Sequence, residues 1–175
     1  IQVIDPLIDE VVDSIFINGR APQSIVNDRE GNLWVTYGNI QKDKPYGIVC
    51  IDPETKSILK QFHYKEGLNE LIKPSINATK DTLYWICVDY SSGTEGNGIF
   101  RMPIHADVLP DQPFITAAPF QYFYALGIDP RDNLIYIGDP KSFIESSEIR
   151  IYNSAGELHH QFTTSMGVGD FFFDE

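Results

Sequence analysis

The feature that most constrains the fold is an internal repeat of about 50 residues. Its three copies surround Leu33, Leu83 and Leu134 and read Asn-Leu-Trp-Val-Thr, Thr-Leu-Tyr-Trp-Ile and Asn-Leu-Ile-Tyr-Ile. Each copy is an apolar run typical of a strand, and further short runs flank it, separated by turn residues. Four short strands per repeat at this period are typical of β-propeller blades. Because no segment keeps an apolar period of 3.6 residues for three turns, we expect an all-β fold.

The repeat divides the chain into complete and partial blades. We expect complete four-stranded antiparallel blades at 22–64, 74–116 and 123–164. Residues 1–17 are predicted to be the last two strands of a preceding blade, and 168–175 a closing strand or the inner strand of a next blade. A closed ring needs about four to eight blades, so about three and a half predict a fragment of a seven-bladed ring. A compact four-bladed closure and the pairing of two half-rings are the open alternatives.

Composition and charge exclude several classes of partner. The net charge is −12, and 42% of the residues are hydrophobic, which indicates a globular domain with an acidic surface. Such a surface repels phosphate backbones, so we expect no nucleic-acid partner. No run approaches the roughly 20 apolar residues that a membrane-spanning helix needs. The need for solubility is sufficient to explain the negative charge. The alternative, more specific interpretation is that the chain binds a cation or a positively charged partner.

The two cysteines lie in apolar strand-like runs. Cys50 belongs to 48–51 and Cys87 to 83–88. We expect two separate buried thiols, since free cysteine behaves as a small hydrophobe. A disulfide between them is the alternative. No metal site and no cofactor are predicted, because neither cysteine has further ligands at suitable spacing.

Three segments carry a resemblance to a known family. They are Leu-Gly-Ile-Asp-Pro-Arg-Asp-Asn-Leu-Ile-Tyr-Ile-Gly-Asp at 126–139, Ile-Arg-Ile-Tyr-Asn-Ser-Ala-Gly-Glu-Leu at 149–158, and Gly-Val-Gly-Asp-Phe-Phe-Phe at 167–173. Together they resemble YncE-like or surface-layer-type seven-bladed β-propellers, and the last one resembles the end of lipoprotein members from Gram-negative gut anaerobes. The resemblance implies the C-terminal half of an exported protein of the cell surface or periplasm. It also implies a link to nutrient uptake, with an outer-membrane transporter as a possible partner.

The lengths of the connections predict which face binds a ligand. Within each blade the first-to-second turn is short and the second-to-third loop is long, and the links between blades open on the side of the long loops. We call these the short-turn face and the long-loop face. Aromatic and polar residues on loops above a rigid scaffold are a common way to bind ligands. The candidate ligand-binding residues on the long-loop face are Tyr37, Asn39, Tyr46, Asp89, Tyr90, Tyr122, Asp139, Lys141 and Phe143. The alternative for the aromatic residues is that they pack between blades.

Aspartates occur at the strand ends of both faces. Asp28, Asp52 and Asp129 lie in turns of the short-turn face, where we expect them only to form turns. Asp89 and Asp139 directly follow second strands on the long-loop face. They are suited to Ca²⁺, to a sugar hydroxyl or, as a pair, to glycoside hydrolysis. We favour backbone capping instead, which predicts that replacing either one by Ala changes stability by less than about 2 kcal/mol.

These features favour a non-enzymatic propeller that binds a small molecule or a protein. The alternatives are a propeller enzyme, such as a lactonase, glycosidase or quinoprotein dehydrogenase, and a purely scaffolding module. An enzyme should place carboxylates or a metal cluster at the mouth of the central channel. The first strands begin instead at Ala21, Lys73 and Phe123, which form no consistent acidic set.

Overall fold

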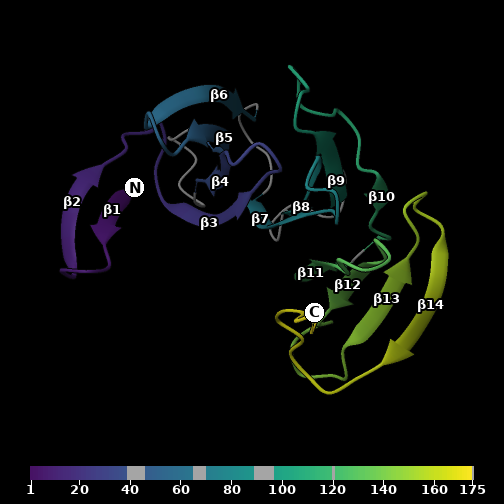
Figure 1. Cartoon of the computed structure of the whole chain (residues 1–175). Coiled ribbons are helices and arrows are strands. Elements are labelled where there is room, and N and C mark those ends of the chain that lie inside the picture. Colours follow the sequence, from purple (N-terminus) through teal and green to yellow (C-terminus); the bar gives the residue numbers. More distant parts are fainter. Residues whose placement is uncertain (39–45, 65–69, 89–96, 120, 175) are drawn as a thin grey trace.

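The computed structural model describes the whole chain except residues 39–45, 65–69, 89–96, 120 and 175. The described residues contain β-strands and no helix. Three four-stranded antiparallel sheets, here blades one to three, follow a two-stranded N-terminal sheet along the chain. In Figure 1 the blades follow one another along an open arc, and the C-terminus lies beside β11 and β12. The prediction of an all-β fold made of four-stranded propeller blades is therefore confirmed.

The strands of each sheet are adjacent in the chain. The N-terminal sheet pairs β1 (Gln2–Asp5) with β2 (Glu10–Ser14). Blade one contains β3 (Pro22–Asn27), β4 (Leu33–Tyr37), β5 (Gly47–Asp52) and β6 (Ser57–His63). Blade two contains β7 (Glu70–Ile76), β8 (Thr82–Val88), β9 (Gly98–Pro103) and β10 (Ile115–Thr116). Blade three contains β11 (Ala125–Ile128), β12 (Ile135–Asp139), β13 (Glu148–Tyr152) and β14 (Leu158–Thr163). Each blade therefore runs in order from its first strand to its fourth, and the first strand β7 contacts both β3 and β11.

The hydrophobic core lies between the blades. Trp34 of β4 packs with Trp85 of β8 in the layer between blades one and two. Ile86 of β8 packs with Ile135 and Ile137 of β12 in the layer between blades two and three. Adjacent strand residues point to opposite faces, so one strand contributes to two layers. The central strands are consequently buried on both sides, as their nearly continuous apolar sequences predict.

Both cysteines are buried and neither forms a disulfide, as predicted. Cys50 and Cys87 both belong to the layer between blades one and two. Burial raises the pKa of the Cys50 thiol to about 12. Both side chains therefore serve as small apolar core groups.

The aspartates of the short-turn face form turns, as predicted. Asp28 accepts hydrogen bonds from the backbone N–H groups of Glu30 and Asn32, both at 2.9 Å. Asp129 accepts one from the backbone N–H of Arg131 at 2.9 Å. Asp52 accepts bonds from two backbone N–H groups and one hydroxyl in the 53–56 turn. Carboxylates that accept bonds from their own turn fix its geometry, which explains why Asp recurs there.

Blade two begins earlier than the sequence predicts. The sequence indicates a break over 65–74 and a blade that starts at 74, whereas β7 begins at Glu70. The register of β7 against β8 shifts between Ile72 and Ser75, and Lys73 has a left-handed φ of 52°. This irregularity accommodates Pro74, which has no N–H to donate, so the strand continues through the position where a break was expected.

The C-terminal segment differs from its prediction. Residues 168–174 belong to no strand, although an inner strand was expected. Phe171 and Phe173 instead pack beside Tyr136 of β12, with ring centroids 5.7 and 5.2 Å from the Tyr136 ring. Gly127 of β11 makes room for both side chains, because a Cβ there would lie 2.8 Å from the ring of Phe173 and 2.9 Å from the Cβ of Phe171. The apolar run is thus accommodated by side-chain packing against blade three without strand pairing.

Candidate ligand-binding cavity

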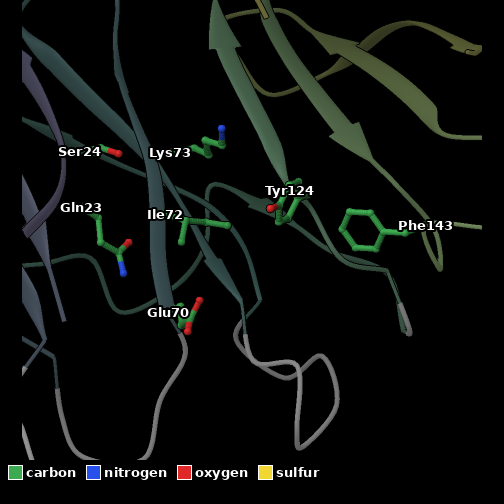
Figure 2. Close-up of a pocket in the computed structure, with 7 residues that line it drawn as sticks. All are labelled: Gln23, Ser24, Glu70, Ile72, Lys73, Tyr124 and Phe143. Atoms are coloured by element: carbon green, nitrogen blue, oxygen red, sulfur yellow. The ribbon is translucent and has the colours of Figure 1, made fainter. Parts of the chain in front are cut away.

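A cavity of about 330 Å³ lies where the first strands of the three blades approach one another (Figure 2). This volume is within the range of small-molecule sites, about 300–1,000 Å³. Blade one contributes residues of β3, blade two residues of β7, and blade three residues from the start of β11 and from the β12–β13 loop. The described lining residues are Gln23, Ser24, Glu70, Ile72, Lys73, Tyr124 and Phe143. All three blades are therefore needed to form the site.

The cavity lies at the long-loop end of the first strands. Gln23 is the second residue of β3, Glu70 is the first residue of β7, and Tyr124 directly precedes β11. Each first strand starts on the long-loop face and runs toward the short-turn face. Residues at the starts of these strands therefore place the cavity on the face that loop lengths predict for binding.

An aromatic pair forms one side of the cavity. The rings of Tyr124 and Phe143 are 5.1 Å apart between centroids and nearly perpendicular, with an interplanar angle of 87°. Phe143 is 49% exposed, so much of its ring is available to a ligand. In Figure 2 the Tyr124 side chain lies between Phe143 and strand β7. The pair thus presents an open aromatic surface beside the polar residues of β7.

The loop that carries Phe143 is held in a strained conformation. Lys141 and Phe143 have φ values of 56° and 62°, in the left-handed region that bulky residues rarely adopt. Asp139 accepts a hydrogen bond from the backbone N–H of Lys141 at 2.8 Å, and the carbonyl of Pro140 accepts one from Phe143 at 2.9 Å. Such strain persists only where the surroundings fix it, and it concentrates at binding and active sites.

The charged groups of β7 differ in their partners. The Lys73 ammonium donates to the Asp170 carboxylate at 3.3 Å. Within the part of the chain that the structure describes, the Glu70 carboxylate has no hydrogen-bond or ion-pair partner. Across the cavity, the Gln23 side chain is anchored, because its amide N–H donates to the carbonyl of Gly38 at 2.7 Å. Glu70 is therefore the lining charge that remains available to a ligand.

A network of polar side chains supports the loop that carries Phe143. Buried Asp139 accepts a bond from the Gln121 side-chain amide at 3.2 Å, and the Gln121 carbonyl accepts one from Arg150 at 3.1 Å. Glu148 closes the network by accepting bonds from Arg150 and, at 3.4 Å, from Lys141. Arg150 and Lys141 stabilise the charged form of Glu148, and the pKa of that carboxyl is lowered even though burial acts in the opposite direction. The network satisfies its own charges and fixes the loop.

Three predicted residues of blade three lie at or beside the cavity. Phe143 lines it, Asp139 is the last residue of β12, and Lys141 lies in the loop between them. Asp139 accepts a backbone N–H bond, in agreement with the capping interpretation, and its second oxygen is occupied by Gln121. Among the described residues no group of three His, Cys, Asp or Glu side chains is placed to hold a metal ion.

Three predicted aromatic residues pack between blades instead. Tyr37 is only 1% exposed, its hydroxyl contacts His63 at 2.8 Å, and its ring lies in the core cluster that also contains Ile15 and Ile17. Tyr46 stacks on Tyr64, with ring centroids 5.9 Å apart, against the core between blades one and two. Tyr122 packs against the core between blades two and three. Long aromatic side chains at strand ends thus reach back into the interblade layers.

The other candidate residues lie outside the described part of the chain, and most residues that line the cavity were not predicted. Asn39, Asp89 and Tyr90 lie outside the described residues. Six lining residues were not among the candidates: Gln23, Ser24, Glu70, Ile72, Lys73 and Tyr124. The signal that identifies them is their position at the starts of the first strands, which converge at the centre of a propeller.

Several solved structures are similar in fold to this chain, and one of those described next is named as a β-propeller domain. A quinoprotein alcohol dehydrogenase-like protein from Bacteroides thetaiotaomicron has a TM-score of 0.61 and 16% identity over 81% of this chain and 33% of its own. Hydrazine synthase from Kuenenia stuttgartiensis has a TM-score of 0.64 and 12% identity over 97% of this chain and 57% of its own. The β-propeller domain of the Trilobed protease from Pyrococcus furiosus has a TM-score of 0.57 and 10% identity over 82% of this chain and 42% of its own.

These similarities show the β-propeller fold and leave activity open. This chain spans from a third to just over half of the length of those three proteins. No protein-family model matches the sequence, and no curated protein sequence matches it. In the described part of the chain, no helix has the length and apolar character needed to cross a membrane.

Proposed function

We propose that this chain is part of a non-enzymatic binding β-propeller that holds a small molecule at the long-loop mouth of its central channel. The observation that carries the proposal is the cavity formed jointly by the first strands of three blades. Ligand sites are commonly concave, mostly apolar, and furnished with a few polar groups that fix orientation. The Tyr124–Phe143 pair supplies the apolar surface, and Glu70 supplies a polar group without a described partner.

The support of the Phe143 loop favours the same function. Its strained backbone is fixed by hydrogen bonds before any ligand arrives. Pre-organisation of this kind strengthens binding because less conformational freedom is lost when the ligand binds. The loop is therefore suited to hold an aromatic contact in place.

Cellular location and partner belong to the same proposal. The resemblance of 126–139 and 167–173 to YncE-like and surface-layer-type propellers supports an exported lipoprotein of the cell surface or periplasm, linked to nutrient uptake. An outer-membrane transporter is the partner that such a role would require. Fractionation of cells that express the full gene product tests this part, and a cytoplasmic location would contradict it.

The binding proposal is tested by blocking the cavity. Ser24 is exposed and lines the cavity from β3, so Ser24→Trp should fill it without disturbing the core. Gln161→Trp, on the exposed outer strand β14, is the matched control. Saturation-transfer NMR is recorded with choline, benzoate, 3,3-dimethylbutanoate and methyl glucoside. We expect at least one probe to bind the native chain and the control but not Ser24→Trp. If no probe binds, or if Ser24→Trp binds normally, the proposal is wrong.

A further inference from the structure

We propose that the ligand of this cavity carries an organic cation, a protonated amine or a quaternary ammonium group, held between Glu70 and the Tyr124–Phe143 pair. This inference rests on the proposed binding function and deepens it by naming the ligand class. It is drawn from the charges that line and surround the cavity and from the geometry of its aromatic wall.

The charge balance of the cavity favours a cation. Among the described lining residues the charged ones are Glu70 and Lys73, and Lys73 is paired with Asp170 at 3.3 Å. Glu70 has no counter-charge among the described residues. A partly buried carboxylate is more stable beside a positive group, so a cationic ligand satisfies the lining charge that has no partner among the described residues.

Two cations of the network that supports the Phe143 loop are likewise paired within the protein. Lys141 and Arg150 both contact Glu148, and Lys141 lies 3.9 Å from Asp139. An anionic ligand would have to compete with these carboxylates for its counter-charges. The net charge of −12 also gives the whole chain a field that attracts cations and repels anions.

The aromatic wall adds a second attraction of the same sign. The face of an aromatic ring carries negative potential and attracts cations placed above it. The two rings are nearly perpendicular, and Phe143 remains 49% exposed. Rings at an angle beside a carboxylate are the arrangement that recognises alkylated ammonium groups.

The test compares three probes of nearly the same shape and different charge: choline, its neutral isostere 3,3-dimethylbutan-1-ol, and 3,3-dimethylbutanoate. Dissociation constants are measured by NMR titration of the 175-residue chain. We expect choline to bind at least about tenfold more tightly than the neutral isostere, with no binding of the anion.

Two variants identify the groups responsible. Glu70→Gln keeps the shape and removes the charge, so it should weaken choline binding about tenfold while leaving the weak binding of the isostere unchanged. Glu10→Gln, on the exposed strand β2, is the matched control, because it removes the same charge away from the cavity. It should bind choline as tightly as the native chain. Thermal unfolding of each variant verifies that it is folded.

The outcomes separate this inference from the binding proposal beneath it. Equal affinity for choline and its isostere, tighter binding of the anion, or an unchanged choline affinity in Glu70→Gln would each overturn the cation assignment. In those cases a probe that Ser24→Trp still excludes keeps the binding proposal intact. If no probe of any charge binds in the cavity, both proposals fail together.

Discussion

The two faces of the molecule use the same polar residue types for different purposes. On the short-turn face, Asp28 and Asp129 are buried and accept bonds from their own turns. On the long-loop face, Glu70 lines a cavity and has no partner among the described residues. A satisfied buried carboxylate stabilises the fold, whereas an available one in a cavity can bind. The satisfaction of hydrogen bonds therefore distinguishes the structural face from the binding face better than residue type does.

The short-turn face also connects neighbouring blades. Arg29 of blade one donates its backbone N–H to the Lys80 carbonyl of blade two at 2.9 Å, and its side chain pairs with Asp81 at 3.2 Å. The backbone N–H of Ala78 donates to the Asn133 side chain of blade three at 2.8 Å. These bonds hold the blades together at the end opposite the cavity, which leaves the long loops free to differ in sequence.

The largest expected effect is on the short-turn face. Asp28→Ala removes the acceptor of two backbone N–H groups and of the buried Trp34 indole N–H, which is 2.8 Å from the carboxylate. We expect the free energy of unfolding to fall by about 3 kcal/mol, because buried donors lose their partner. Urea denaturation measures it. Asp52→Ala, in an exposed turn without an indole, is the control and should cost about 1 kcal/mol. Equal losses would show that the indole bond is unimportant.

A smaller effect is expected for the aspartate of the long-loop face. Asp139→Ala removes the cap on the Lys141 N–H and the bond from Gln121. We expect a loss of about 1.5 kcal/mol in urea denaturation, since the network still contains Glu148 and Arg150. Added Ca²⁺ should not change the free energy of unfolding of the native chain or of Asp139→Ala. A much larger loss that Ca²⁺ reverses would instead identify a metal site.

The exposed aromatic residue should separate binding from stability. Phe143→Ala removes a ring that is 49% exposed, so we expect a loss of only about 0.5 kcal/mol in unfolding free energy. Binding of the cavity probe should weaken about tenfold in the same variant. The comparison of the two faces would be wrong if Phe143→Ala destabilised the fold as strongly as Asp28→Ala.

The smallest effect is expected in the pH dependence of stability. Hydrogen bonds from Arg131, first from its side chain and then from its backbone N–H, lower the pKa of Asp129 below its ordinary value of 3.8. The carboxylate therefore contributes stability above that value and loses the contribution as the pH falls through its lowered pKa. In Arg131→Met, the midpoint of unfolding should therefore depend less steeply on pH below about pH 4 than it does in the native chain. An unchanged acid limb would show that the pair does not contribute.

Sequence alone predicts the strands that repeat regularly. The copies around Leu33 and Leu83 correspond to β4 and β8, and the copy at Leu134 is followed directly by β12. These strands are buried on both faces, so their apolar pattern is strong and continuous. The turn aspartates are equally predictable, because their function depends only on residues nearby in the chain.

The cavity depends on relations that local patterns do not contain. The sequence of 65–74 indicates a break, and only pairing with β8 shows that β7 begins at Glu70. Glu70 and Ile72 therefore escape notice, although they line the cavity. The side chain of Tyr37 lies in the core, and its place at a strand end does not reveal this direction. Site residues brought together from three blades require tertiary information.

The pairing of every strand with its chain neighbour has a consequence for folding kinetics. Each blade closes only short loops, so it can form early at a small entropic cost. Bonds between blades, such as that between Ala78 and Asn133, span 55 residues and must follow. The cavity needs three blades at once and is therefore the last feature to appear. During refolding, ligand binding should consequently report complete assembly, later than any spectroscopic signal of β-sheet.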